Sequence, residues 1–190
     1  MLFRSAFQPA FVLETTLDFL EEGLTRSAYY HIRDAFVDEA QFAQFMSPKG
    51  AAFVARWWND TPQYDGLFDN HGQVRPAYFA FKLMSLIKGR RLAIQGANEA
   101  VKGFAAANPS GVHAVIWNFG SAAGDPQEVV LRFRFHKAGQ YRLTRLNCFN
   151  RVNQLELKRH GNFTDSTSAS VNFQLQPYDV YWVSFDLSAL

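Results

Sequence analysis

The hydrophobic pattern of this 190-residue chain changes its period near Arg90. Before that point apolar residues recur every three to four positions, as in helices that bury one face. After it, apolar and polar residues tend to alternate, most clearly over residues 127–135, which is typical of strands with one buried face. The sequence therefore predicts two parts, a mixed α/β segment over residues 1–89 and a β domain over residues 90–190.

Eight short segments of the second part have strand character, and Gly, Asn, Ser, Asp or Pro residues separate them. They are residues 92–95, 100–106, 112–119, 127–135, 140–147, 153–158, 170–175 and 180–187. Short strands at this spacing predict an antiparallel β-sandwich. Trp117 and Trp182 lie within two of these segments, and we expect both indoles in the sandwich core.

The first part predicts a helix, a strand, a long loop and a second helix. The expected elements are a helix over 9–22, a strand over 27–34, short helices near 39–45 and 50–58, and a helix from Pro76 to near Gly89. The strand is apolar on both sides, which is typical of a parallel strand covered on two faces. A connection as long as 35–75 is usually functional or contains helices of its own.

Composition excludes several classes of protein. The formal net charge is only +2, and the basic residues are scattered, so we expect no nucleic-acid partner. Cys148 is the only cysteine, which rules out an internal disulfide and favours a reducing compartment such as the cytoplasm. We expect no metal and no cofactor. We also expect a soluble protein without a membrane anchor, because no apolar run reaches the roughly 20 residues of a membrane span.

Four motifs of the first part occur in an order known from one family of enzymes. They are the aromatic strand Tyr30–Asp34, the acidic stretch Ala35–Glu39, the Gly-Leu step in Asp65–Phe68, and the Arg-Pro-aromatic helix start in Val74–Phe81. This order resembles the closing segment of glycoside hydrolase family 39, which includes β-xylosidases and α-iduronidase. The resemblance implies the last β/α unit of a (β/α)8 barrel followed by the accessory β-sandwich. It covers most of this chain but only about the final quarter of a full barrel.

The resemblance also implies what this chain lacks. Enzymes of the family retain the anomeric configuration and need two carboxylates about 5–5.5 Å apart. In the family these are glutamates at the ends of the fourth and seventh strands, and both positions precede this chain. The acidic residues Glu14, Glu21 and Glu22 lie on a predicted helix and cannot replace them. We therefore assign no catalytic residue and expect the chain to be inactive by itself.

Five residues are candidates for binding a sugar of the xyloside type. Asp34, Asp38 and Glu39 follow the strand that the resemblance places eighth in the barrel, where the loops face the active site. Trp57 and Trp58 could stack on a pyranose ring, although neighbours on a helix point about 100° apart and only one would be free to do so. For Asp38 and Glu39 the sequence favours an ordinary solvated acid or a helix cap over a sugar contact.

Three functions remain open at this stage. The chain could be the C-terminal portion of a glycoside hydrolase, a non-catalytic carbohydrate-binding module, or an assembly module that oligomerises through its α/β segment. A lone parallel strand leaves backbone N–H and C=O groups unpaired on both edges, and the neighbouring helices have apolar faces without partners. Other polypeptide must cover both. We therefore expect a homo-oligomer or an association with the missing portion of a barrel.

Overall fold

The computed structural model describes residues 7–61, 66–119, 124–133, 138–148, 154–164 and 169–187. Four helices come first: α1 (Phe7–Glu21), α2 (Glu39–Phe42), α3 (Pro48–Asp60) and α4 (Pro76–Leu86). Eight strands follow: β1 (Arg90–Leu92), β2 (Val101–Asn108), β3 (Gly111–Asn118), β4 (Gln127–Phe133), β5 (Gly139–Asn147), β6 (Gln154–Phe163), β7 (Ala169–Leu175) and β8 (Val180–Leu187). The order of elements is the mixed α and β order that the sequence predicts.

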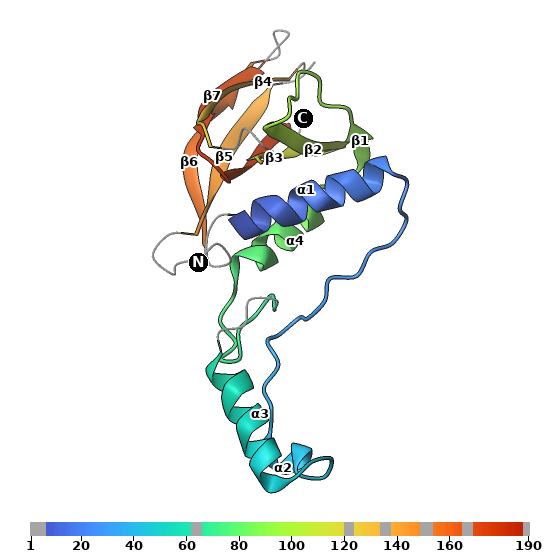
Figure 1. Ribbon diagram of the computed structural model, residues 1–190. Helices are drawn as coiled ribbons and strands as arrows, with labels where there is room; N and C mark the ends of the chain where they lie inside the picture. The colour runs from blue at the N-terminus through green and yellow to red at the C-terminus, as the bar shows by residue number, and fades with distance from the viewer. Residues whose placement is uncertain are drawn as a thin grey trace.

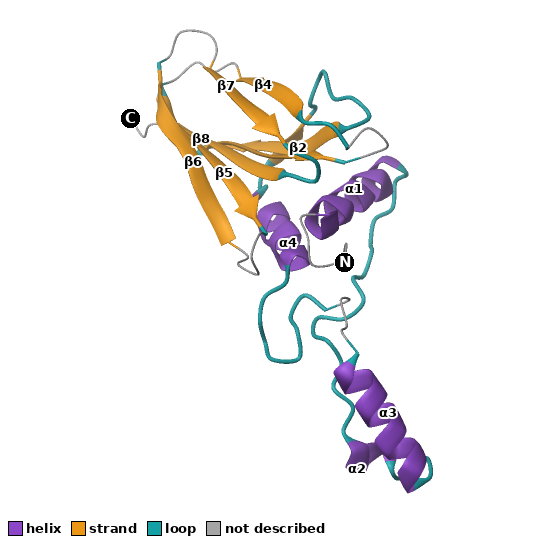
Figure 2. Cartoon of the chain, turned by 60° about the vertical axis from the view of Figure 1, so that its left-hand side comes forward, coloured by secondary structure: helices purple, strands orange, loops and turns teal. Residues whose placement is uncertain are grey.

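The strands form two antiparallel sheets (Figures 1 and 2). The larger has the order β1-β2-β3-β8-β5-β6, and the smaller contains β4 and β7. In the centre of the larger sheet, β3 pairs with β8 from Gly111 opposite Asp186 to Trp117 opposite Val180. Seven of the eight predicted strands are confirmed, although the expected residues 134, 135 and 153 lie outside the described part of the chain. The strand expected over 92–95 was misplaced, because β1 ends at Leu92 and residues 93–95 form no strand.

The larger sheet has a hydrophobic core on each of its faces. The inner core lies between the two sheets and contains Val171 and Leu175 of the small sheet with Val183 and Phe185 of β8. The outer core lies beneath helices α1 and α4, and its largest buried members are Leu13, Leu17, Phe79, Leu83, Phe104, Val115, Trp117 and Val180. Helices α1 and α4 thus share a core with the strands, and a domain boundary at residue 89 stays a prediction.

Two tryptophans belong to the outer core rather than to the space between the sheets. Trp117 is fully buried and Trp182 is half-buried, and both pack with the residues under the helices. The expectation that they lie in the sandwich core was wrong in this respect. Alternation along a strand predicts which side chains share a face, but not whether a helix or a second sheet covers that face.

The predicted strand over 27–34 does not form. Its backbone makes only a single parallel bridge, from Arg33 to Phe68, and the side chains of Tyr30 and Ile32 are 77% and 71% exposed. A parallel strand needs neighbouring strands on its edges and covered faces. Among the described residues only the short stretch around Phe68 pairs with the backbone of this segment, so the apolar run stays extended without joining a sheet.

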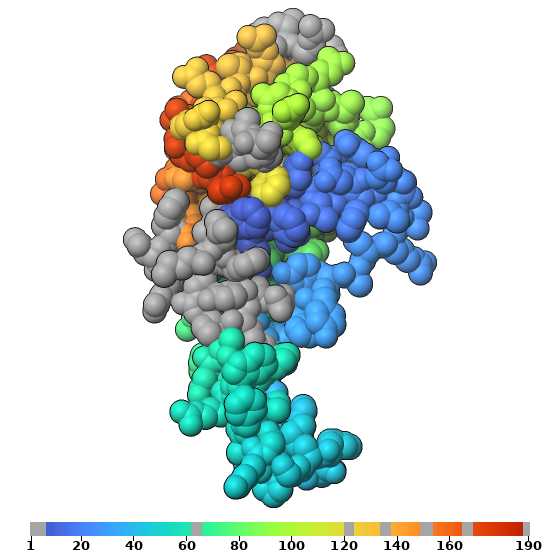
Figure 3. All heavy atoms as spheres, viewed as in Figure 1, coloured from blue at the N-terminus to red at the C-terminus, as the bar shows by residue number. Residues whose placement is uncertain are grey.

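Helices α2 and α3 project away from the sandwich (Figures 1 to 3). Ser47 caps the start of α3 by accepting a hydrogen bond from the Gly50 amide at 3.2 Å, and Pro48 occupies the first turn. The side chain of Asn59 ties this helix to the preceding chain through paired 2.9 Å hydrogen bonds with the Val37 backbone. We call residues 24–75 the arm. Within the described residues, no helix has the length and apolar character to cross a bilayer.

Candidate functional site

Asp34 is the buried anchor of the arm. Its Oδ1 accepts a hydrogen bond from the Gly66 amide at 3.0 Å, and its Oδ2 forms an ion pair with the Arg75 guanidinium. Its backbone amide donates to the Phe68 carbonyl at 2.9 Å. Because both carboxylate oxygens have partners and the side chain is only 4% exposed, the geometry favours a structural role. A substrate contact by Asp34 stays a prediction.

Gly66 is required where the arm meets Asp34. A Cβ atom at this position would come within 2.5 Å of the Asp34 backbone nitrogen and would also clash with the Phe68 carbonyl oxygen. Only glycine allows this close approach of two backbone segments. The Gly-Leu step of the sequence motif is therefore explained by packing; its first residue, Asp65, lies outside the described residues.

Asp38 and Glu39 lie at the start of α2 on the exposed surface of the arm. The Asp38 carboxylate accepts a hydrogen bond from the Ala40 amide at 2.9 Å, which makes Asp38 the N-cap of α2. Glu39 is exposed in the first turn, where a carboxylate interacts favourably with the helix dipole. Asp38 thus has the capping role that the sequence left open, while a sugar contact by either residue stays a prediction.

Trp57 and Trp58 differ in exposure, as their neighbouring positions on a helix require. The ring of Trp57 is 56% exposed, whereas Trp58 is half-buried. The two rings meet edge to face with their centroids 5.9 Å apart and their planes at 69°. They therefore do not form a flat platform, and of the two only Trp57 presents a broad free face.

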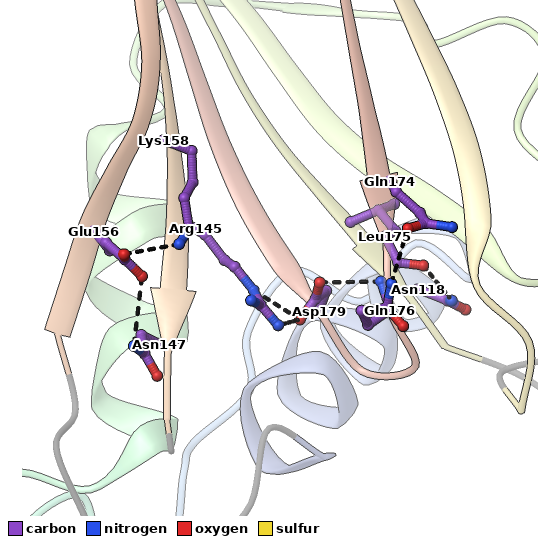
Figure 4. Close-up of polar contacts among 9 residues, drawn as sticks. All are labelled: Asn118, Arg145, Asn147, Glu156, Lys158, Gln174, Leu175, Gln176 and Asp179. Atoms are coloured by element: carbon purple, nitrogen blue, oxygen red, sulfur yellow. Dashed lines mark hydrogen bonds and ion pairs between the residues drawn. The ribbon is translucent and has the colours of Figure 1, made fainter. Parts of the chain in front are cut away.

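A cleft that the sequence did not indicate opens between β6 of the large sheet and β7 of the small sheet. Figure 4 shows some of its lining residues, among them Arg145, Lys158 and Asp179. The cleft has a volume of about 380 Å³ and is lined by Leu143, Arg145, Lys158, Arg159, Asn172, Phe173, Gln174, Gln176, Asp179 and Tyr181. None of the five candidate residues from the sequence lines it. In the described part of the chain the small sheet has two strands, so it leaves part of the inner face of the large sheet uncovered, and the cleft there has both charged and apolar lining residues.

A buried ion pair forms one end of the cleft. The guanidinium of Arg145 donates to Asp179 Oδ1 from Nε at 3.0 Å and from Nη2 at 2.6 Å, and the Gln176 amide donates to Asp179 Oδ2 at 3.0 Å (Figure 4). Burial raises the pKa of Asp179, although Arg145 and the Gln176 amide act in the opposite direction. The pair fixes the turn between β7 and β8 against β5.

A β-bulge shapes the other side of the cleft. Leu143 pairs with Arg159 and Thr144 pairs with Leu157, which leaves Lys158 as the extra residue on β6. Neighbours on a regular strand point to opposite faces, but a bulge redirects one of them, and Lys158 and Arg159 both line the cleft. No simple sequence signal marks such a bulge, which explains why the cleft was missed.

A second cavity, of about 520 Å³, lies where α1 meets β1 and β2. Next to it, Glu14 binds two partners: its Oε1 pairs with the Lys102 ammonium, and its Oε2 accepts from Trp117 Nε1 at 2.7 Å. The hydrogen bond to Glu14 raises the pKa of Lys102. Since Glu14 and Trp117 are buried, this arrangement locks α1 onto the sheet. Nowhere in the described residues do three metal-ligating side chains gather.

The fold has counterparts among solved structures, although neither a protein-family model nor a curated protein sequence matches the chain. A family 39 glycoside hydrolase from Xanthomonas axonopodis pv. citri matches 98% of this chain with a TM-score of 0.69 and 14% identity. A monomeric β-xylosidase from Caulobacter crescentus CB15 matches 99% with a TM-score of 0.63 and 17% identity. A family 86 β-porphyranase from Bacteroides plebeius matches 97% with a TM-score of 0.57 and 15% identity.

This chain has the fold of the C-terminal part of family 39 glycoside hydrolases. It spans 42% of the Xanthomonas enzyme and 43% of the Caulobacter enzyme, so more than half of each matched structure has no counterpart here. The sequence-based resemblance to the end of a family 39 barrel with its accessory sandwich is thereby confirmed at the level of fold.

Proposed function

We propose that this chain is the C-terminal portion of a glycoside hydrolase of the β-xylosidase type and does not hydrolyse glycosides by itself. The observation that carries this proposal is the match to the Xanthomonas structure over 98% of this chain and 42% of that one. The proposed division of labour is that the remaining polypeptide supplies the two catalytic carboxylates. This chain supplies the closing segment of the barrel and the sandwich that supports it.

The exposed surface of the arm supports the same proposal. Six large apolar side chains between residues 30 and 57 are more than half exposed: Tyr30, Ile32, Phe36, Phe45, Phe53 and Trp57. Exposed apolar surface on this scale is typical of a site of contact with another polypeptide. In the complete enzyme, the rest of the barrel would cover the extended segment around Ile32, and this segment would then form the last strand.

The arm would also provide sugar contacts at the rim of the active site. Under this proposal Trp57 presents its free face to a xyloside, and Asp38 and Glu39 accept hydrogen bonds from sugar hydroxyls. Asp34 holds the segment in place through Gly66 and Arg75. No metal or other cofactor is needed, because two carboxylates suffice for glycoside hydrolysis with retention.

An assembly module is the second candidate, and the same exposed arm favours it. If the chain acts alone, a second copy would have to cover the side chains that the barrel otherwise covers. In that case the sandwich would bind carbohydrate without hydrolysing it.

Hydrolysis of 4-nitrophenyl β-D-xyloside distinguishes these candidates. The chain alone is expected to give no release above buffer, whereas the chain extended by the polypeptide encoded upstream of the Met1 codon is expected to release xylose with retained configuration, as read by NMR. Turnover by the chain alone would overturn the proposal. A stop codon directly upstream would favour the assembly module.

A further inference from the structure

We draw no further inference here: the strongest candidate, the cavity of about 520 Å³ where α1 meets β1 and β2, is lined by charged side chains that are either exposed or already paired, and nothing in the described part of the chain points to a ligand for it.

Discussion

The sandwich and the arm differ in how far their aromatic side chains are exposed to solvent. Phe185 in β8 is completely buried between the sheets, whereas Phe53 in α3 is 70% exposed. The sandwich, with α1 and α4 on its outer face, has two continuous cores. The arm is held by a few polar interactions, such as the ion pair of Asp34 with Arg75 and the hydrogen bonds between the Asn59 side chain and the Val37 backbone.

This difference shows which part of the fold is complete within the chain. A region that buries its own apolar side chains can be stable alone, because that burial is the main favourable term in folding. A region that leaves them exposed is shaped for contact with something else. We therefore propose that the arm is one half of an interface, whereas the sandwich buries its own core. Four experiments can break or sharpen this comparison.

Truncating a phenylalanine in each region should give the largest contrast. Phe185→Ala should lower the free energy of unfolding by about 3–5 kcal/mol, because it opens a cavity in a closed core. Phe53→Ala should change it by less than about 0.5 kcal/mol in the isolated chain, because the side chain is exposed. Urea denaturation followed by circular dichroism measures both. Similar losses for the two variants would remove the distinction between the regions.

The buried thiol of Cys148 should make the sandwich sensitive to alkali. Burial raises the pKa of Cys148 from its ordinary 9.0 to about 12. Between these values the folded state keeps a proton that the unfolded state releases, so stability present below pH 9 is lost as the pH rises. The loss is about 1.4 kcal/mol per pH unit. The urea midpoint should fall more steeply between pH 8, 9 and 10 for the natural chain than for Cys148→Ala. If the midpoints of the two proteins fell equally with pH, Cys148 would not lie in a closed outer core.

Removing the Asp34 anchor should loosen the arm without unfolding the sandwich. In Asp34→Ala, the Gly66 amide loses its acceptor and Arg75 loses its ion pair with Asp34, so hydrogen exchange at Gly66 and Phe68 should accelerate by at least about tenfold. Exchange at Val115 in β3 should not change. Asp60→Ala is the control, because Asp60 is exposed and pairs with the exposed Arg56 one turn earlier on the same helix. If Asp34→Ala left Gly66 protected, the anchor would have been misassigned.

The smallest effect should come from the cap of α2. Asp38→Ala removes the acceptor of the Ala40 amide and should destabilise this short helix by about 1 kcal/mol, with no effect on the sandwich. Asp38→Asn should preserve the cap and serves as the control. Amide chemical shifts of the arm report the change, and a helix α2 that stays intact in Asp38→Ala would show that the cap is dispensable.

The sequence predicts the sandwich better than the arm, and the reason is physical. Strands with one buried face carry their pattern in the chain itself, which is why 127–133 and 180–187 could be placed almost residue by residue. The strand over 27–34 needs neighbouring strands that the described residues do not supply. Its apolar run therefore matches the surroundings of a strand inside a complete barrel rather than the extended segment found here.

The candidate sites also divide into those that depend on local sequence and those that depend on distant strands. Asp38, Glu39 and Trp57 could be identified as exposed polar or aromatic residues of a loop, because exposure follows from local sequence. The cleft could not, since it depends on a bulge at Lys158 and on a small sheet that covers only part of a larger one. Both are properties of how distant strands pair, and alternation within one strand does not report them.

Light scattering with size exclusion at tens of micromolar tests most directly whether the arm is half of an interface. We expect the natural chain to form a dimer or larger species through its exposed apolar side chains. A variant with Ile32, Phe36 and Phe53 replaced by Ser is expected to be a folded monomer. A natural chain that is itself a monodisperse monomer at this concentration would contradict the account.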